Sequence, residues 1–511
     1  MISLFDEGAF APCPAPFNLA AHVLARAAEC PDKIALAVLG SAKAAPWSFA
    51  RLEAAVRGTG TGLLGAGLVP GDIVLMRLGN GVEFPIAYLG AIAAGLVPVP
   101  TSSQLTAPEV AAMIETLSPK AILLGDGIAC PDTPGLRVIN TDALAAMRAL
   151  PPCAYAMGDP NRLAYIIYTS GTSGHPHAVM HAHRAIWARR MMYDGWYGLT
   201  PDDRVLHAGA FNWTYTLGTG LMDPWSVGAT ALIPEPGTAP EQLPDLLKQH
   251  DATIFAAVPG VYRKLLNQNI KLDLPKLRHG LSAGEKLPEA IRTAWTAATG
   301  TSIYEAFGMS ECSTFISASP GYPCRPGTLG RPQKGRRVAI VDDTGTPVPL
   351  GEDGIIAVSA RDPGLMLGYF GANEEAGNRS KGEWFLTGDQ GAMAQDGQIT
   401  YRTRADDMMN AGGYRVSPLE VEAALQGAAG LSEIAVTAVE VKADTRLIAA
   451  FYTSAAPLDE AALCAHAAKH LARYKQPRFW LRVDALPRNP NGKLLRAALH
   501  PLFEAHHNGQ A

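Results

Sequence analysis

Residues 168–174 read Tyr168-Thr169-Ser170-Gly171-Thr172-Ser173-Gly174, and this run decides how the rest of the chain is interpreted. The apolar segment 163–167 precedes it and has the β-branched and aromatic residues of a buried strand. Glycines permit φ > 0, so successive backbone N–H groups can turn toward one point, and the hydroxyls add further donors. Because it has no acidic residue, the loop is suited to holding phosphate; an ordinary Ser/Gly surface turn is the competing interpretation.

The composition describes a soluble globular protein with ample core. The chain has 511 residues, which predicts two or more domains, and 48% of them are hydrophobic. Forty-three basic against 47 acidic side chains give a net charge of −4. The basic residues form no block, so nucleic-acid binding through phosphate neutralisation has little support.

Cysteine usage and the N-terminus favour a cytoplasmic protein. The seven cysteines are scattered without a C-x-x-C pair, which argues against a disulfide framework and a zinc site. The first residues include Asp6 and Glu7 and no basic start, unlike a secretory signal. The longest uncharged stretch, 84–108, is interrupted by prolines and glycines. It predicts a buried helix followed by a buried strand, and no membrane span.

Strand and helix patterns alternate over the first 200 residues or so, which predicts parallel sheets covered by helices. The run 60–65 matches the dinucleotide-binding pattern G-x-G-x-x-G. It follows a helical segment at 51–57, where that fingerprint needs a strand, so we reject a dinucleotide site there.

Four histidines lie within nine residues at 175–183 and raise the possibility of a metal site. They have no nearby carboxylate or thiolate, and a helix is expected to begin near His183 and to divide the set. Local packing or substrate-facing roles are therefore favoured.

The remaining chain completes an α/β fold with a second, smaller domain. Segments 280–285 and 304–311 each predict a strand that runs into a polar loop, where open α/β sheets place their ligands. From about residue 327, short strands between Gly, Pro and Asp turns predict a β-rich subdomain that extends to 405. After that the pattern becomes a compact α+β unit. We therefore expect a large N-terminal domain over 1–405, of layered, mostly parallel sheets with helices, and a small C-terminal domain over 406–511.

Six motifs along the chain resemble, in the same order, those of the adenylate-forming enzymes. This family comprises acyl- and aryl-CoA synthetases, peptide-synthetase adenylation domains and luciferases. The segments around Leu281 and 211–213 look most like the CoA ligase branch. The six motifs are the loop at 168–180, then 282–288, 306–311, 384–389, 404–407 with 412–416, and 487–493.

The chemistry that this resemblance implies has two steps. A carboxylate oxygen attacks the α-phosphorus of ATP, which forms an acyl adenylate and releases pyrophosphate. A thiol then attacks the activated carbonyl and expels AMP. The crowded phosphate charge requires a hydroxyl-rich loop, a Mg²⁺ ion and a lysine.

The resemblance also assigns the nucleotide site. Ser310 would contact phosphate, and Glu311 would hold Mg²⁺ unless it is only a helix cap. Asp389 would accept both ribose hydroxyls, with Arg404 beside it, unless the two form an ordinary surface pair. Phosphate binding falls to Thr169, Ser170, Gly171, Thr172 and Gly174, and the adenine side to Gly284, Glu285, Ala306 and Phe307.

The C-terminal motifs carry the remaining catalytic roles. Lys493 would lie between the carboxylate and the α-phosphate in the first step, although an Asn-Gly-Lys turn by itself is usually a solvated loop. Asp406 would be the hinge of a mobile small domain. In the second step, Gly412, Gly413 and Tyr414 would line the tunnel for the pantetheine of coenzyme A.

Four residues depart from the family pattern. The loop has Pro176-His177-Ala178 where Pro-Lys-Gly is usual, and neutral imidazole cannot replace a permanent ammonium beside pyrophosphate. Ser310 replaces the usual Thr and keeps the hydroxyl. Thr403 stands where Gly is common.

We expect the acid pocket to be built from Phe211, Trp213 and Tyr215, together with 282–283 and 306–309. Trp213 and Tyr215 would close a short pocket that favours a small or aromatic acid, unless Trp213 is simply part of the core. The set therefore includes Ser282, Ala283, Gly308 and Met309.

The function expected from these residues is a ligase that joins a small or aromatic acid to coenzyme A, with ATP and Mg²⁺. Two alternatives stay open: an adenylating enzyme that loads a carrier-protein thiol, and a degenerate, non-catalytic nucleotide-binding homologue suggested by His177. A P-loop NTPase is excluded because G-x-x-x-x-G-K-[ST] does not occur. A homodimer is compatible with the sequence but is not predicted by any motif.

Overall fold

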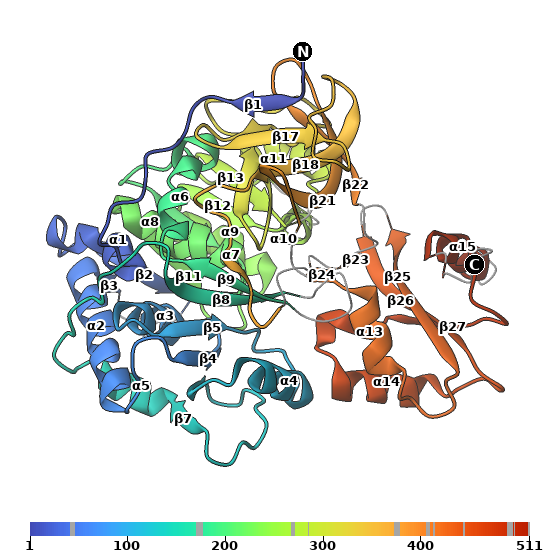
Figure 1. Ribbon diagram of the computed structural model, residues 1–511, viewed down its shortest axis with the longest axis horizontal. Helices are drawn as coiled ribbons and strands as arrows, with labels where there is room; N and C mark the ends of the chain where they lie inside the picture. The colour runs from blue at the N-terminus through green and yellow to red at the C-terminus, as the bar shows by residue number, and fades with distance from the viewer. Residues whose placement is uncertain are drawn as a thin grey trace.

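The computed structural model describes residues 1–40, 46–169, 177–266, 271–284, 286–372, 379–404, 409–411, 414–442, 445–487, 494 and 496–508. Figure 1 shows a large body built from several stacked sheets and, beside it, a smaller unit that contains β25–β27 and α13–α15. The predicted α/β architecture, with a large N-terminal and a small C-terminal part, is confirmed.

The outermost layer of the large body is a four-stranded parallel sheet in the order β5-β4-β6-β7. Its neighbouring helix α3 and strand β5 make up most of the uncharged stretch, and nearly all of their residues are buried, as predicted. No helix within the described residues has the length and apolar character needed to cross a membrane. The elements are α2 (Phe49–Gly65), β4 (Ile73–Arg77), α3 (Glu83–Ala93), β5 (Val97–Pro100), α4 (Ala107–Leu117), β6 (Ala121–Leu124), β7 (Arg137–Asn140) and α5 (Thr141–Met147).

Two glycines of the rejected dinucleotide pattern, Gly60 and Gly62, lie inside α2 and allow close helix packing. A Cβ on Gly60 would lie 2.7 Å from the Cys153 sulfur, and a Cβ on Gly62 would lie 2.1 Å from Met147 Cγ. Larger residues would therefore push these neighbours away from α2.

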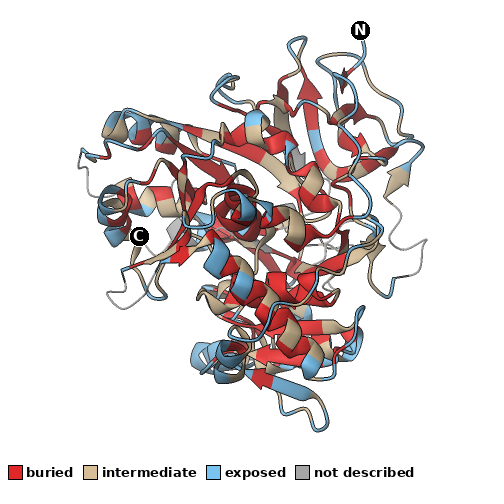
Figure 2. Ribbon diagram, turned by 90° about the vertical axis from the view of Figure 1, so that its left-hand side faces the viewer, coloured by how far each residue is buried: buried red, intermediate tan, exposed pale blue. Residues whose placement is uncertain are grey.

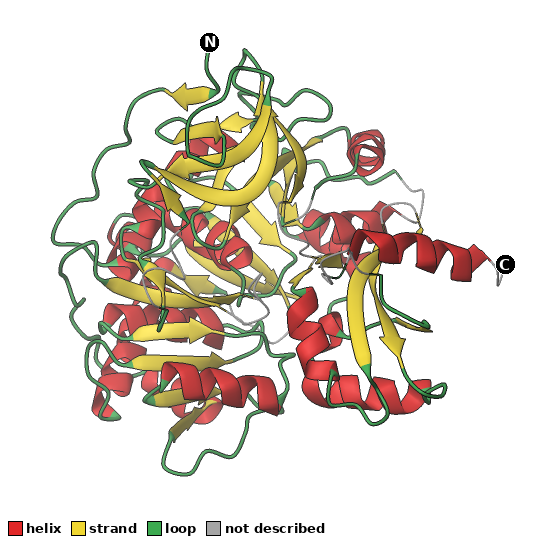
Figure 3. Ribbon diagram, turned by 45° about the vertical axis from the view of Figure 1, so that its right-hand side comes forward, coloured by secondary structure: helices red, strands yellow, loops and turns green. Residues whose placement is uncertain are grey.

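The central sheet has nine strands in the order β16-β15-β14-β13-β12-β10-β11-β2-β3, parallel from β14 to β2 and antiparallel at both edges. Figure 3 shows its strands (yellow) in layers with the helices that cover them (red). Its strands are β2 (Ile34–Leu39), β3 (Trp47–Ser48), β10 (Arg204–His207), β11 (Thr230–Pro234), β12 (Ile254–Ala257), β13 (His279–Ala283), β14 (Ser302–Met309), β15 (Ser313–Ser317) and β16 (Arg331–Pro332). Its helices are α1 (Leu19–Val23), α6 (Ala185–Ala188), α7 (Thr214–Leu217), α8 (Asp223–Val227), α9 (Leu243–Gln249), α10 (Pro259–Leu266) and α11 (Glu289–Thr299).

The strand before the phosphate loop departs from the parallel arrangement expected. β8 (Leu163–Thr169) pairs antiparallel with β9 (His177–Ala182), and β9 pairs with β19 (Gly368–Tyr369). Thr169 lies opposite His177. The expectation was wrong here because the connection is too short for the crossover that a parallel pair requires.

The β-rich part is a six-stranded sheet, and it takes in a strand from the N-terminus. β1 (Leu4–Asp6) pairs antiparallel with β17, so this sheet is not confined to residues 327–405. Figure 2 shows buried residues (red) along its strands and those of the other sheets. The other members are β17 (Arg337–Val341), β18 (Asp353–Ser359), β20 (Ser380–Lys381), β21 (Trp384–Met393) and β22 (Ile399–Arg404).

The small unit has a three-stranded sheet with apolar clusters on its two faces. The sequence predicted its first helix, two strands and second helix, and the structure adds β27, parallel to β26, and a terminal helix. Its elements are β23 (Met409–Ala411), β24 (Tyr414–Val416), α13 (Pro418–Leu425), β25 (Glu433–Lys442), β26 (Thr445–Thr453), α14 (Glu460–His470), β27 (Phe479–Arg482) and α15 (Leu499–Asn508).

Aromatic rings and a buried lysine join the small unit to the large one. Tyr414 stacks on Trp213 of the large unit, with ring centroids 6.2 Å apart and planes 15° apart. On its other side it stacks on Tyr474 at 4.1 Å. The Lys475 ammonium lies 2.6 Å from Glu420 of α13 and 3.2 Å from Glu109 of α4, so it bridges both units.

A buried ion pair holds the β-rich sheet to the turn that follows β14. Arg336 pairs with Asp362, and both side chains are at most 1% exposed. Asp362 also accepts from the Gly364 N–H at 2.7 Å. Two residues after Gly364, the Met366 N–H donates at 2.7 Å to the carbonyl of Glu311, which lies in that turn.

We predict that Asp362→Asn lowers the free energy of unfolding by about 3–5 kcal/mol, because it leaves the buried Arg336 charge uncompensated. The readout is the urea midpoint of the large unit. Asp273→Asn is the matched control, since its partner Lys248 is about half exposed and such pairs contribute about 0–1 kcal/mol. Equal effects of the two substitutions would contradict this role of the buried pair.

Candidate active site

A cavity of about 940 Å³ lies between the two units. The large unit contributes the ends of β8, β10, β13 and β14, and the small unit contributes Tyr414, Glu420, Tyr474 and Lys475. The parallel strands β10, β13 and β14 end here at their carboxyl ends, which is where open α/β sheets place ligands.

Many of the residues chosen from the sequence meet in this cavity although they come from separate motifs. They are Thr169, Trp213, Ala283, Gly284, Gly308, Met309, Ser310, Glu311 and Tyr414.

Glu311 lies in the turn between β14 and β15, so it is not a helix cap. The Tyr369 hydroxyl donates to its Oε1 at 2.8 Å, which orients the carboxylate and leaves acceptor capacity for a cation. Oxygen ligands of this kind suit Mg²⁺. The neighbouring Ser310 carbonyl lies 2.8 Å from His181 Nε2. Burial lowers the pKa of His181 to about 4, so this ring is neutral.

The described histidines of segment 175–183 have three different environments. His177 lines the cavity and lies against the Tyr369 ring, with centroids 4.8 Å apart. His181 contacts Ser310, and His183 Nδ1 accepts from the Leu19 N–H at 3.0 Å. Within the part of the chain that the structure describes, no group of three or more His, Cys, Asp or Glu side chains is placed to hold a metal ion.

The two residues predicted to hold the ribose lie opposite each other on neighbouring strands. Asp389 of β21 is in register with Arg404 of β22, and Asp389 is buried. The Tyr401 hydroxyl donates to Asp389 Oδ1 at 3.4 Å. Because its carboxylate is buried, Asp389 does not belong to an ordinary surface ion pair. It is not part of the cavity lining.

Four further residues expected at the ligand do not line the cavity. Phe211 packs in the core against Phe84, 5.7 Å between centroids, so the expectation that it forms a pocket wall was wrong. Ser282 precedes the cavity-lining Ala283 on β13, and consecutive strand residues point to opposite faces. The other two members of the set are Ala306 and Phe307 of β14.

Trp213 and Tyr215 both line the cavity, as expected. Trp213 is half-buried and stacked on Tyr414, so it is not simply part of the core. Gly284 has φ +95°, and a Cβ there would lie 3.0 Å from the Trp213 ring. The Tyr215 hydroxyl donates to the Leu281 carbonyl at 3.1 Å, which leaves its ring as a wall.

Several predicted residues lie outside the described part of the chain, and their roles stay predictions. They are Ser170, Gly171, Thr172, Gly174, Glu285, Asp406, Gly412, Gly413 and Lys493.

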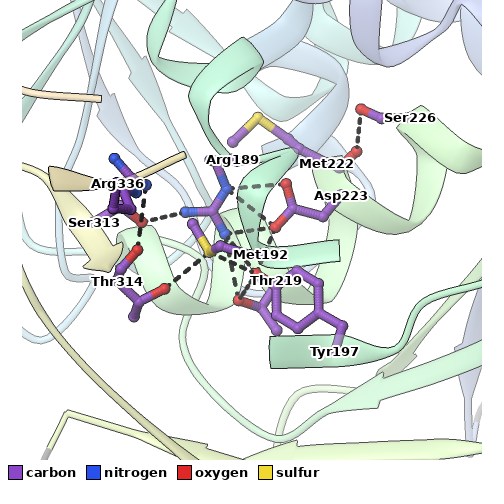
Figure 4. Close-up of polar contacts among 10 residues, drawn as sticks. All are labelled: Arg189, Met192, Tyr197, Thr219, Met222, Asp223, Ser226, Ser313, Thr314 and Arg336. Carbon is purple, nitrogen blue, oxygen red and sulfur yellow. Dashed lines mark hydrogen bonds and ion pairs between the residues drawn. The ribbon is translucent and has the colours of Figure 1, made fainter. Parts of the chain in front are cut away.

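Sequence reasoning missed a group of polar residues at the deep end of the cavity: Arg189, His207, Thr219, Ser313 and Thr314. Figure 4 shows Thr219, Ser313 and Thr314 near the Arg189 guanidinium, which lies between Ser313 on one side and Asp223 on the other. These contacts join residues up to 124 positions apart, and no local motif announces them.

Comparison with known proteins agrees with these motifs. A family model described as AMP-binding enzyme matches residues 23–370, and one described as AMP-binding enzyme C-terminal domain matches residues 420–493. A benzoate–CoA ligase of Thauera aromatica is 30% identical over 85% of this chain and 86% of its own. A 3-hydroxybenzoate–CoA ligase of Aromatoleum sp. (strain CIB) is 29% identical over 92% and 94%.

The fold also matches a solved structure, that of a double mutant of o-succinylbenzoate CoA synthetase from Bacillus subtilis bound to a product analogue. The TM-score is 0.83 at 24% identity, over 94% of this chain and 98% of the other. With the family models covering most of the chain, the protein belongs to the AMP-binding enzyme family, among its adenylate-forming acyl-CoA ligases.

Proposed function

We propose that the protein uses ATP and Mg²⁺ to activate a small aromatic carboxylic acid and transfers the acyl group to coenzyme A. The observation that carries this proposal is the shape of the cavity beside Ser310 and Glu311. Aromatic walls, Trp213 and Tyr215, lie near the small residues Ala283, Gly284 and Gly308, and together they favour a flat ring. The aryl-CoA ligases at 29–30% identity support the same class of acid.

In the first step, the carboxylate oxygen attacks the α-phosphorus and pyrophosphate leaves. The hydroxyls of Thr169 and Ser310, which line the cavity, would donate to phosphate oxygens, and Asp389 with Arg404 would hold the ribose. Glu311 would hold the Mg²⁺ ion, which neutralises phosphate charge when bound. Lys493 would steady the negative charge that develops between the two reactants.

In the second step, the coenzyme A thiol loses its proton, its sulfur attacks the acyl carbonyl, and AMP leaves. We propose that the structure corresponds to this step, with the small domain (406–511) turned about Asp406. Tyr414 lines the cavity, whereas Leu494, next to Lys493, packs with the cluster on the α15 side of the small sheet. The likeness to a ligase bound to a product analogue supports this assignment.

The cytoplasmic location, the homodimer and the domain limits expected from the sequence remain proposals. All seven cysteines are free, which supports a cytoplasmic enzyme. A homodimer stays open, as do the domain limits at 405/406 and about 327.

We predict that pyrophosphate is released with ATP, Mg²⁺ and an aromatic acid, and that coenzyme A converts the adenylate to thioester and AMP. Lys493→Ala should slow adenylation by about 10²–10³-fold, because it removes one charge that stabilises the transition state. It should leave the conversion of preformed acyl adenylate by coenzyme A nearly unchanged. The measurement is single-turnover kinetics of each half-reaction.

The other outcomes separate the alternatives. Pyrophosphate release without coenzyme A turnover would favour a carrier-protein acceptor. ATP binding without turnover of any acid in a broad panel of short, branched and aromatic acids would favour a non-catalytic homologue. Loss of both half-reactions in Lys493→Ala would contradict the division of roles between the two steps.

We predict that His177→Lys lowers the KM for ATP by about three- to tenfold at pH 8.5 and by little at pH 5.5. Lysine keeps its charge at both values, whereas histidine usually loses its charge between about pH 5 and 8. The matched control is His250→Lys, a change on the surface away from the cavity. An effect of the same size at both pH values would show that the charge of His177 does not act on ATP.

A further inference from the structure

The deep end of the cavity is unusually polar for a pocket that would hold an aromatic ring. Arg189 follows α6 and is only 5% exposed. Its Nε and Nη2 donate to the buried Asp223 carboxylate at 2.6–3.0 Å, and Nη2 also lies 3.1 Å from the Tyr197 hydroxyl. We call Arg189, Tyr197, Thr219, Asp223 and Ser313 the Arg189 network (Figure 4).

The backbone around this network is specialised. Two π-helical turns, η2 (Tyr193–Tyr197) and η3 (Gly218–Met222), bring Tyr197 and Thr219 to the guanidinium. Such turns are rare in proteins and are frequent at functional sites. A Cβ on Gly218 would lie 2.1 Å from Arg189 Nη2, so the guanidinium packs directly on the backbone of η3.

Ser313 connects the network to the cavity. Arg189 Nη1 donates to its hydroxyl oxygen at 2.5 Å. That hydroxyl keeps its own proton, which it can donate, because serine has one donor and two acceptor sites. A donor from a guanidinium polarises the O–H group and makes it a stronger donor in turn.

The backbone of Ser313 is held in a conformation that favours glycine. Its φ is +65°, in the left-handed region, and it pairs with Met309, next to Gly308, where the pairing of β14 with β15 is irregular. A Cβ on Gly308 would lie 2.1 Å from the Ser313 carbonyl oxygen. A residue with a side chain in this region costs free energy, and such residues gather at binding sites. Serine in place of glycine adds a hydroxyl to this position, which lines the ligand cavity.

The charges of the network favour a neutral substituent on the ligand. Burial alone would lower the pKa of Arg189, but the adjacent Asp223 carboxylate more than offsets this and raises it, so the two groups form an ion pair. A second carboxylate on the acid would meet Arg189 already neutralised and Asp223 close by. This end of the cavity therefore offers hydrogen-bonding groups, and no net charge, to a substituent of the acid.

His207 provides a second polar group at the same end. It lines the cavity and is 2% exposed, and neither of its ring nitrogens has a hydrogen-bond partner among the described residues. Burial lowers its pKa to about 3, so the imidazole is neutral and has one donor and one acceptor. Buried polar atoms without partners are costly, and a polar ligand group relieves that cost.

We propose that the acid carries a neutral hydrogen-bonding substituent, a hydroxyl or amino group, on the ring remote from its carboxylate, and that Ser313 selects it. This proposal rests on the proposed function. Arg189 acts as a positioning residue that orients and polarises the Ser313 hydroxyl, while Tyr215 contributes a wall for the ring. An unsubstituted or methyl-substituted ring leaves the Ser313 proton and the His207 nitrogens without partners.

The experiment compares kcat/KM for pyrophosphate release with benzoate, 3- and 4-methylbenzoate, 3- and 4-hydroxybenzoate and 3- and 4-aminobenzoate. We expect at least one hydroxy- or aminobenzoate to exceed both benzoate and its methyl isostere by at least about tenfold. Sites built to hydrogen-bond a substrate hydroxyl discriminate by more than that, up to about 10⁴–10⁵-fold.

Ser313→Ala should reduce that preference by about tenfold or more, through a lower kcat/KM for the preferred hydroxy- or aminobenzoate. Alanine removes only the hydroxyl and keeps the Cβ with its backbone constraint, so the comparison isolates the hydroxyl. Ser226→Ala is the matched control, because its hydroxyl donates to the Met222 carbonyl next to the network without lining the cavity.

The outcomes are distinguishable. Equal use of benzoate, methyl and hydroxy acids, or an unchanged preference in Ser313→Ala, would overturn the substituent proposal and leave the aromatic-acid ligase standing. Turnover of aliphatic acids with silence on every benzoate would overturn the proposed function itself. If Ser313→Ala fails to fold, the wild-type preference among the isosteric acids still decides the proposal.

Discussion

The buried ammonium of Lys475 is the contact on which the arrangement of the two domains depends. It is 6% exposed and lies between Glu420 of the small unit and Glu109 of the large one. Burial alone would lower the pKa of Lys475, but nearby Tyr474, Glu420 and Glu109 raise it more. The net pKa lies above the ordinary value for lysine, so the ammonium stays charged. A buried charge needs its partners. With this contact in place, Tyr414 stacks on Trp213, and both rings line the cavity between the domains.

The two domains divide the chemistry in a way that follows from their construction. The large domain provides fixed groups at the ends of parallel strands and in the turn with Glu311, which Tyr369 and His181 orient. Groups held in this way require little reorganisation when charge develops. In the proposed function, rotation of the small domain would exchange the residues that it presents, and one cavity would serve two successive reactions.

Local sequence patterns predicted the elements well because hydrophobic periodicity is a local property. The helix α3 and strand β5 were recognised from an uncharged stretch, and the motifs placed Ser310, Glu311 and Trp213 in one cavity. Pairings between distant segments were not accessible in this way. Neither the antiparallel return of β9 nor the contact of Arg189 with Ser313 leaves a local signal, and Phe211 shows that a motif position can belong to the core.

The most direct test of this account is single-turnover kinetics of the two half-reactions in Lys475→Met. The substitution leaves Glu109 and Glu420 facing each other without a cation, so it destabilises the observed arrangement of the two domains. Each 1.4 kcal/mol of destabilisation lowers the population of this arrangement about tenfold. We predict that transfer from preformed acyl adenylate to coenzyme A slows by at least about tenfold, while adenylation is unchanged or faster. Lys248→Met, which removes an exposed ion pair, should change neither step. Slower adenylation with normal thioester formation would contradict the assignment of this structure to the second step.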